Sequence, residues 1–162
     1  MSAGARSYWL LKSEPQAFSI DDLARRPAQT EAWDGVRNYQ ARNFLRDEMR
    51  PKDQAFFYHS SCAQPAIVGI VEILAPARPD PTQFDPSDPH YDPRAHRQTP
   101  RWWLVDVRLV RRLRRPIELA ELRRHADRLA GLALLARGSR LSVMPVTPQH
   151  WHFILALRPP PG

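Results

Sequence analysis

Several residue types are scarce in this 162-residue sequence, and each scarcity excludes a class of protein. The single cysteine, Cys62, cannot form an internal disulfide, which fits a reducing compartment. Six glycines are too few and too scattered for the Gly-rich fingerprints of phosphate loops and dinucleotide-binding domains. No apolar run approaches the ~20 residues that cross a bilayer, and the N-terminal apolar stretch is shorter than the ~7–15 residues of a signal peptide core. We therefore expect a soluble intracellular protein, cytoplasmic and without a membrane partner.

Acidic residues are in the minority. The chain has 24 Lys and Arg against 17 Asp and Glu, which gives a net charge of +7 and a pI of about 10.5. A positive charge of this size favours polyanionic partners such as nucleic acids. Only Lys12 and Lys52 are lysines, however, and the abundance of Arg, Ala and Pro also fits a bias in genome composition. Charge alone therefore raises nucleic-acid binding as a hypothesis without deciding it.

Patterns for metal binding and nucleophilic catalysis are also missing. His150 and His152 are two residues apart in an expected helix, so they point to different sides of it. His90 and His96 lie in a Pro-rich segment that does not fix a metal geometry. Cys62 stands in an expected turn, and no Gly-x-Ser-x-Gly elbow occurs. We therefore expect no metal, no cofactor and no catalytic residue.

Hydrophobic patterning predicts about five or six strands. Short apolar or alternating runs predict strands at 8–12, 54–60, 66–74 and 102–115, and a final strand after Gly138. The second and third of these runs are joined by a short linker, so we expect an antiparallel hairpin. Gly69 lies inside one run, which predicts a bulge or the close approach of another group.

Helix signals alternate with these strands in irregular order. Ser19, with Asp22 three positions later, forms an approximate capping box ahead of a short helix. A helix over 38–49 is predicted after the turn at Asp34-Gly35, and Trp33 is expected at the joint between loop and helix. Further helices are predicted over 118–129 and after Thr147, where Pro148 takes the first helical position.

Residues 76–100 contain seven prolines and almost no aliphatic residues, which predicts a long loop, either laid over the sheet or partly mobile. Residues 158–162 are expected to form a short disordered tail. The length suits a single domain over residues 1–162. Strands separated by irregular helices, without a βαβ repeat, favour an α+β domain around a curved sheet or small barrel.

Polar and aromatic residues with possible binding chemistry stand at the ends of the predicted strands. They are Lys12, Ser13, Glu14, Trp33, Arg37, Asn38, Tyr58, His59, Ser60, Ser139, Arg140 and Ser142. If the sheet curves into a barrel, these strand ends converge on one concave site. Trp33 would then offer a flat face for a ring, because aromatic stacking contributes ~1–3 kcal/mol per base. Asn38, Ser13 and Glu14 would meet the donors and acceptors on the edge of a flipped base.

Three basic residues, Arg37, Lys12 and Arg140, would pair with phosphates on this hypothesis. Each proposed role also has a purely structural alternative. Trp33 could cap the core instead of binding a ligand, and Arg37 could neutralise Asp34. The residues alone leave both interpretations open.

The order of motifs resembles the EVE domain family. The matching pieces are YWLLKSEP (8–15), WDGVRNYQARN (33–43), FFYHS (56–60), AIVGIVEI (66–73), FDPSDPHYDP (84–93), WWLVDVRLV (102–110) and GSRLSVMPVTPQHWHFIL (138–155). The resemblance implies a PUA-like pseudo-barrel of mixed strands surrounded by short helices, related in shape to YTH domains. It also implies a pocket for a modified base, notably modified cytosine in DNA and possibly modified RNA. The pocket residues would be Lys12, Ser13, Glu14, Trp33, Arg37, Asn38, Tyr58, His59, Ser60, Ser139 and Ser142.

From the sequence we thus expect a monomeric, non-enzymatic protein that binds nucleic acid and flips a modified base into an aromatic and polar pocket. The principal alternative is a hydrolase or other enzyme acting on modified nucleotides or bases, with Glu14 and His59 as its titratable groups. A third possibility is a module that binds a small molecule or another protein.

Overall fold

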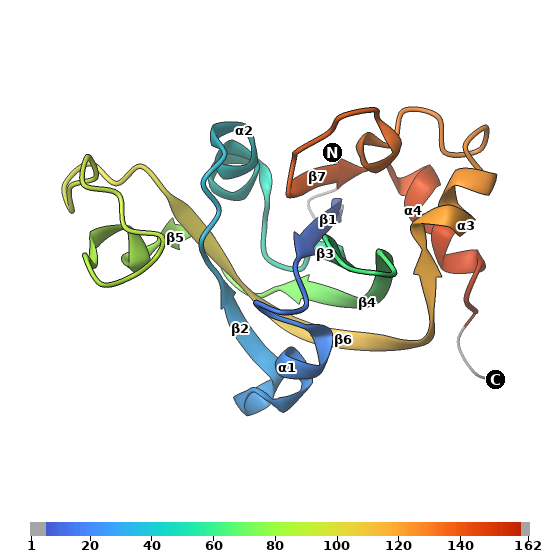
Figure 1. The fold of residues 1–162 in the computed structure, drawn as a ribbon, viewed down its shortest axis with the longest axis horizontal. Coiled ribbons are helices and arrows are strands. Elements are labelled where there is room, and N and C mark those ends of the chain that lie inside the picture. The colour runs from blue at the N-terminus through green and yellow to red at the C-terminus, as the bar shows by residue number, and fades with distance from the viewer. Residues whose placement is uncertain (1–5, 160–162) are drawn as a thin grey trace.

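A curved mixed β-sheet forms the centre of the computed structural model, which describes residues 6–159 (Figure 1). Its strands are β1 (Tyr8–Ser13), β2 (Thr30–Trp33), β3 (Gln54–His59), β4 (Ala66–Ile73), β5 (Arg78–Pro79), β6 (Trp103–Glu118) and β7 (Val143–Val146). They are ordered β2-β6-β4-β3-β1-β7, with β5 paired to β6. β1 and β3 run parallel, and the other strand pairs of the described chain are antiparallel. The α+β class is confirmed, and residues 6–159 form seven strands in an open sheet instead of the predicted five or six.

Short helices connect the strands. They are α1 (Ile20–Arg25), η1 (Pro27–Gln29), α2 (Tyr39–Asn43), η2 (Phe44–Glu48), η3 (Pro81–Phe84), α3 (Leu119–Arg124), η4 (Ala133–Leu135) and α4 (Pro148–Ala156). The predicted helix over 38–49 is α2 followed by the π-helical turn η2, whereas the one over 118–129 ends already at Arg124. Within residues 6–159, none of the helices is both long enough and apolar enough to cross a membrane.

The predicted helix caps are confirmed. Ser19 and Asp22 form a reciprocal capping box at the start of α1. Thr147 caps α4, and Pro148 takes its first position, where the missing N–H costs nothing. Side chains thus satisfy N–H groups that the first turns of these helices would otherwise leave without partners.

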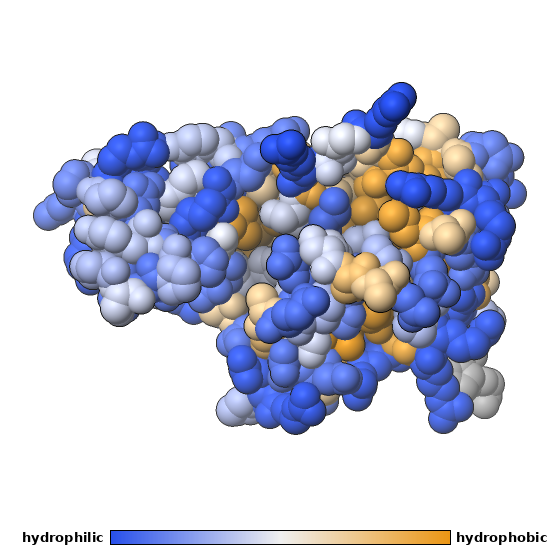
Figure 2. Space-filling model, viewed as in Figure 1, coloured by the Kyte–Doolittle hydropathy of each residue, from blue (hydrophilic) through white to orange (hydrophobic). Residues whose placement is uncertain are grey.

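Two hydrophobic clusters cover the two faces of the sheet. The first includes Leu23 of α1 and Phe57 of β3, and the second includes Leu122 of α3 and Trp151 of α4. Neighbouring residues of β3 point to opposite faces, so Phe57 and Tyr58 belong to different clusters. In Figure 1, α3 and α4 lie together at one end of the molecule, and β5 lies at the other. Hydrophilic residues cover most of the face drawn in Figure 2.

Gly69 occupies a crowded position in β4. The pairing of β4 with β6 shifts register between Ile67 and Gly69, as expected for a bulge. A Cβ atom added at Gly69 would lie 2.3 Å from Cδ1 of Ile20 and 2.6 Å from the carbonyl oxygen of Arg111. Both features predicted for this glycine, the bulge and the close approach, are therefore confirmed, and α1 packs directly on the sheet at this point.

The segment around Trp33 differs from the sequence-based expectation. Trp33 does not lie at a joint between loop and helix, because residues Thr30–Trp33 form β2, which pairs with β6. The strand has only four residues, too few to display an alternating pattern in the sequence. Its pairing with the 16-residue strand β6 stabilises it instead.

Candidate nucleic-acid site

A cleft of about 680 Å³ opens between the end of β1 and β2. Its volume falls in the range of ~300–1,000 Å³ that is usual for small-molecule sites. The lining residues come from the end of β1, the following turn, β2, the segment leading to α2, the Pro-rich loop and the residue before β7. They are Lys12, Ser13, Glu14, Ala17, Phe18, Arg26, Glu31, Ala32, Trp33, Asp34, Gly35, Val36, Arg37, Asn38, His90 and Ser142.

Backbone contacts bring distant segments together at the cleft. The amide of Lys12 donates to the carbonyl oxygen of Ser142 at 2.9 Å, which extends the contact between β1 and β7. The hydroxyl of Ser13 donates to the carbonyl oxygen of Phe18 at 2.6 Å and closes the turn after β1. The sheet therefore places three of the predicted site residues, Lys12, Ser13 and Ser142, side by side.

Trp33 forms one wall of the cleft. Its side chain belongs to the first hydrophobic cluster and is only 7% exposed. The indole meets the ring of Phe57 edge to face, with centroids 5.2 Å apart, and lies 6.2 Å from the ring of Phe18. Phe18 also lines the cleft. Trp33 is thus a core residue that borders the cleft, a position that combines the two alternatives raised by the sequence.

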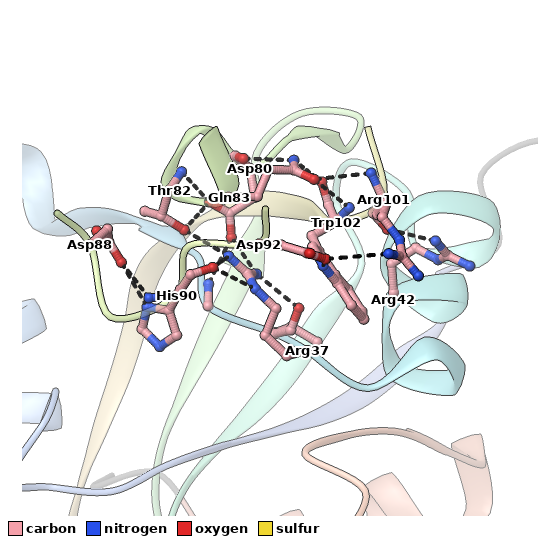
Figure 3. A network of polar contacts seen from close by, with 12 residues as sticks. Arg37, Arg42, Asp80, Thr82, Gln83, Asp88, His90, Asp92, Arg101 and Trp102 are labelled. Atoms are coloured by element: carbon pink, nitrogen blue, oxygen red, sulfur yellow. Dashed lines mark hydrogen bonds and ion pairs between the residues drawn. The ribbon is translucent and has the colours of Figure 1, made fainter. Parts of the chain in front are cut away.

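Arg37 lies in a dense network of hydrogen bonds (Figure 3). Its guanidinium donates to Asp80 at 3.1 Å, to the hydroxyl of Thr82 at 2.9 Å and to the backbone oxygens of Val36 and His90. These contacts engage all five N–H donors of the group. Arg37 therefore lines the cleft as a fixed residue and has no free donor for a further ligand.

Asp80 connects the cleft to the Pro-rich loop. Its buried carboxylate accepts hydrogen bonds from the amides of Gly35 and Thr82, both at 2.8 Å, as well as from Arg37. Burial by itself raises the pKa of Asp80, but the hydrogen bonds from Thr82, Gly35 and Arg37 outweigh it and hold that pKa below its usual value. A charged Asp80 therefore fixes the segment that leads into α2.

The rest of the Pro-rich loop is fixed from within. The buried side chain of Gln83 donates to the backbone oxygen of Trp102 at 2.8 Å and accepts from the amides of Arg101 and Trp102 at 3.0 Å. The indole N–H of Trp102 donates to Asp92 at 2.8 Å (Figure 3). These contacts hold the loop against the start of β6 and place His90 at the rim of the cleft.

The charges inside the cleft differ in whether they are paired. Arg26 pairs with Glu31 at 2.9 Å, whereas the side chains of Lys12, Glu14 and Asp34 form no hydrogen bond or ion pair with residues 6–159. Burial lowers the pKa of Lys12. Burial also raises the pKa of Asp34, and the charge of Asp80 raises it further. The cleft therefore offers a ligand one ammonium group and two carboxylates that the described chain leaves unpaired.

Five predicted residues do not line the cleft: Tyr58, His59, Ser60, Ser139 and Arg140. Tyr58 faces the second hydrophobic cluster, on the opposite side of the sheet. Nε2 of His59 accepts a hydrogen bond from the amide of Ile20 at 3.1 Å, so this ring caps α1. The structure thus places Glu14 in the cleft and His59 outside it.

Several lining residues were not nominated from the sequence. Asp34 and Gly35 lie within the WDGVRN motif, where the turn signal drew attention to backbone conformation and not to the side chain. His90 lies 53 positions from Arg37, and the sequence raised it as a possible metal ligand. No pattern in the sequence indicated Phe18. Among residues 6–159, no three His, Cys, Asp or Glu side chains gather closely enough to hold a metal ion.

The open mixed sheet with short helices and a polar cleft beside its parallel pair defines a PUA-like domain. The YTH domain of the Zygosaccharomyces rouxii MRB1 protein shares this fold, with a TM-score of 0.52 over 95% of this chain and 87% of that chain at 14% identity. The sequence profile of the EVE domain matches residues 7–157. The chain belongs to the EVE domain family, as its resemblance to that family predicted.

Individual relatives support this assignment. Mouse thymocyte nuclear protein 1 is 48% identical, and the match covers 93% of this chain and 73% of the relative. A crystal structure of a Pseudomonas putida protein is similar with a TM-score of 0.89 and 52% identity, over 94% of this chain and all of that one. The human THYN1 protein in complex with 5-methylcytosine containing DNA gives a TM-score of 0.88 at 46% identity, over 93% of this chain and 96% of that chain.

The names of these relatives correct one sequence-based prediction. We predicted a cytoplasmic protein from the absence of targeting and membrane-spanning patterns. The mouse and human relatives are named thymocyte nuclear proteins, which points to the nucleus. The cytoplasmic prediction is therefore wrong by this comparison, because those absences do not distinguish a nuclear protein from a cytoplasmic one.

Proposed function

We propose that this protein is a non-enzymatic reader that binds DNA and takes a single modified cytosine base out of its stack into the cleft. The observation that carries the proposal is the composition of the cleft, whose lining combines the aromatic Trp33 and Phe18 with Lys12, Glu14 and Asp34, three charged groups without a partner among residues 6–159. The DNA complex of the human relative supports the choice of 5-methylcytosine as the base.

The polar groups of the cleft match the edge of a cytosine. Cytosine presents an amino donor at N4, which a carboxylate accepts well, beside ring acceptors that an ammonium group can satisfy. Asp34 or Glu14 would accept from the amino group, and Lys12 would donate to the acceptors. A thymine carries the same methyl group but presents a carbonyl oxygen in place of the amino group, so a carboxylate would repel it. The cleft therefore favours a methylated base that keeps its amino group.

The energies set limits on the selectivity. Removing a base from its stack costs a few kcal/mol, which contacts with the aromatic wall and the polar groups must offset. The added methyl group contributes only about 0.8 kcal/mol when it is buried against the apolar wall. We therefore expect a several-fold preference for 5-methylcytosine over cytosine, and a larger preference over thymine.

Two features favour a binding protein over an enzyme. A hydrolase would need Glu14 and His59 together as an acid–base pair. Glu14 lines the cleft, whereas His59 lies outside it and caps α1. The fixed guanidinium of Arg37 is suited to positioning the cleft wall. Phosphate contacts would then fall to Lys12 and to Arg140, whose side chain is exposed outside the cleft.

The test compares matched duplex and single-stranded oligonucleotides that carry 5-methylcytosine, cytosine or thymine at one position. Fluorescence anisotropy would measure wild type, Asp34→Ala and the control Asp127→Ala, which removes an exposed aspartate outside the cleft. We expect Asp34→Ala to weaken binding of the modified oligonucleotide by about tenfold to a hundredfold, because a hydrogen bond to a charged group contributes about 1.5–3 kcal/mol. The control should bind as wild type does.

Two outcomes would contradict the proposal. Equal affinity of the wild-type protein for all three bases would show that the protein does not recognise the base. A folded Asp34→Ala variant with unchanged affinity and unchanged base preference would show that Asp34 does not take part in base recognition. The same measurement on an RNA oligonucleotide with 5-methylcytosine in the same sequence shows whether the protein prefers DNA or RNA. We expect the DNA to bind more tightly.

A further inference from the structure

An exposed aromatic residue directly follows a residue of the cleft wall in the chain. Tyr39 is 44% exposed and follows Asn38, one of the lining residues, at the start of α2. Consecutive Cα atoms are only ~3.8 Å apart, so the Tyr39 backbone lies next to the cleft wall. A single exposed aromatic residue is not unusual by itself, so what matters here is how the ring of Tyr39 is held.

The ring of Tyr39 rests on a rigid base. It stacks on the indole of Trp102, with centroids 4.8 Å apart and planes inclined by 25°. Trp102 is only 5% exposed, and its indole N–H and backbone amide are held by Asp92 and Gln83. The exposed ring is thus supported from below by a side chain that cannot move without breaking buried hydrogen bonds.

Arginine side chains surround the stack without covering its outer face. The guanidinium of Arg42 lies 4.8 Å from the Tyr39 ring and 6.0 Å from the Trp102 ring. A guanidinium on the outer face of Tyr39 would lie far further from Trp102, so Arg42 is at the rim of the stack. Arg101 donates to the Tyr39 hydroxyl and therefore lies at that edge of the ring. Neither arginine thus lies directly over the outer face, which agrees with the 44% exposure of Tyr39.

We propose that the outer face of Tyr39 is a second stacking site, which binds the base next to the one that enters the cleft. The inference rests on the proposed function, because a flipped base leaves its neighbour without one stacking partner. An aromatic face replaces that partner for any base, since every base has a π face. Arg42 and Arg101 place positive charge at the rim of this ring, which would attract the phosphates that flank the stacked base.

The experiment places 2-aminopurine, whose fluorescence is quenched by stacking, beside 5-methylcytosine or cytosine in a single-stranded oligonucleotide. The variants are Tyr39→Ala, Tyr39→Leu and Tyr39→Trp. The matched control is Tyr91→Ala, because Tyr91 is 40% exposed but has no ring stack or cation–π contact within residues 6–159. Titration of 5-methyl-2′-deoxycytidine by NMR reports on the cleft alone.

We expect wild type, Tyr39→Trp and the control to quench the 2-aminopurine on binding. Tyr39→Ala and Tyr39→Leu should lose the quenching and bind the oligonucleotide about tenfold more weakly, within the range of one aromatic stack. All variants should bind the free nucleoside as wild type does. Tyr39→Leu still covers Trp102, so this variant separates stacking from mere protection of the core.

A Tyr39→Leu variant that quenches and binds like wild type would overturn the second site, and so would an unchanged Tyr39→Ala. The two proposals fail in different ways. If wild type binds cytosine and 5-methylcytosine equally while the Tyr39 effects persist with both, the proposed function fails and the stacking site stands. If the preference for 5-methylcytosine persists while the Tyr39 variants match wild type, only the stacking site fails.

Discussion

At the scale of single residues, His59 links the sheet to α1. It ends β3, and its Nε2 accepts a hydrogen bond from the amide of Ile20 at the start of α1. Only a neutral imidazole offers this acceptor. Burial lowers the pKa of His59, and the nearby carboxylate of Asp21 opposes that effect. Folding therefore favours the neutral ring.

This lowered pKa makes a part of the stability depend on pH. The contribution is fully present above the pKa of about 6.5 for an unfolded histidine, and it is lost as the pH falls through the lower pKa of the folded state. His59→Gln keeps an acceptor oxygen that does not titrate. We therefore expect urea unfolding to show a smaller loss of stability below pH 6.5 for this variant than for wild type.

The control for this experiment is His152→Gln, which removes an exposed histidine on α4. It should follow the wild-type profile. An identical pH profile for His59→Gln and wild type would show that the ring does not gain its neutral form on folding.

The candidate site could be predicted residue by residue only in part. Lys12, Ser13 and Glu14 follow directly from the end of a strong strand signal, and all three line the cleft. Tyr58 lies next to the end of an equally clear strand but faces the other hydrophobic cluster. The end of a strand shows where polar residues gather. The face of the sheet on which each side chain lies depends on the register of strand pairing, which the sequence of one strand does not fix.

At the scale of elements, the Pro-rich loop shapes the cleft although it contributes little to the sheet. It reaches the cleft through Asp80, whose carboxylate holds the amide of Gly35 and the guanidinium of Arg37. We expect Asp80→Asn to destabilise the fold by about 2 kcal/mol, because it weakens hydrogen bonds to a charged and buried group. Oligonucleotide affinity should fall in parallel, since the cleft wall loosens.

Two measurements check this prediction. Urea unfolding gives the stability, and hydrogen exchange of the Gly35 amide should accelerate because that amide loses its charged acceptor. Asp85→Asn, a change at an exposed position of the same loop, keeps its turn hydrogen bonds and should alter neither quantity. Unchanged protection of Gly35 in Asp80→Asn would contradict the role given to this contact.

Elements with strong local signals were predictable, and those held by partners were not. The strands β1, β3 and β4 have continuous apolar runs, and the capped helices carry their own start signals. The strand β2 is only four residues long and depends on pairing with β6. The order within the Pro-rich loop depends on Asp80 and Gln83, whose partners lie up to 45 positions away. Propensity alone carries no such information.

At the scale of the whole molecule, the charge of +7 is the property that would gather DNA around the cleft. The side chains of Arg114, Arg115, Arg123 and Arg124 are exposed and form no ion pair with residues 6–159. Neutralising phosphates releases counterions, so affinity falls as salt rises. This contribution is independent of sequence and leaves recognition to the cleft.

We predict that salt dependence separates the attraction between charges and phosphates from the recognition of the base in the cleft. For a duplex oligonucleotide, we expect the logarithm of the affinity to fall against the logarithm of salt concentration with a slope of about −2 or steeper, since each phosphate contributes about −0.9. The uncharged nucleoside should bind with almost no salt dependence. A flat profile for the oligonucleotide, measured by anisotropy from 50 to 200 mM salt, would argue against phosphate contacts.

The cleft is assembled from residues 12–14, 17, 18, 26, 31–38, 90 and 142, which come from separate parts of the folded sheet and its loops. A partly unfolded chain therefore lacks the complete site, and a molecule that binds only the complete site stabilises the folded chain. Heating the protein with and without a nucleoside then becomes a label-free assay. Each rise in melting temperature ranks one modified base against another without immobilising either partner.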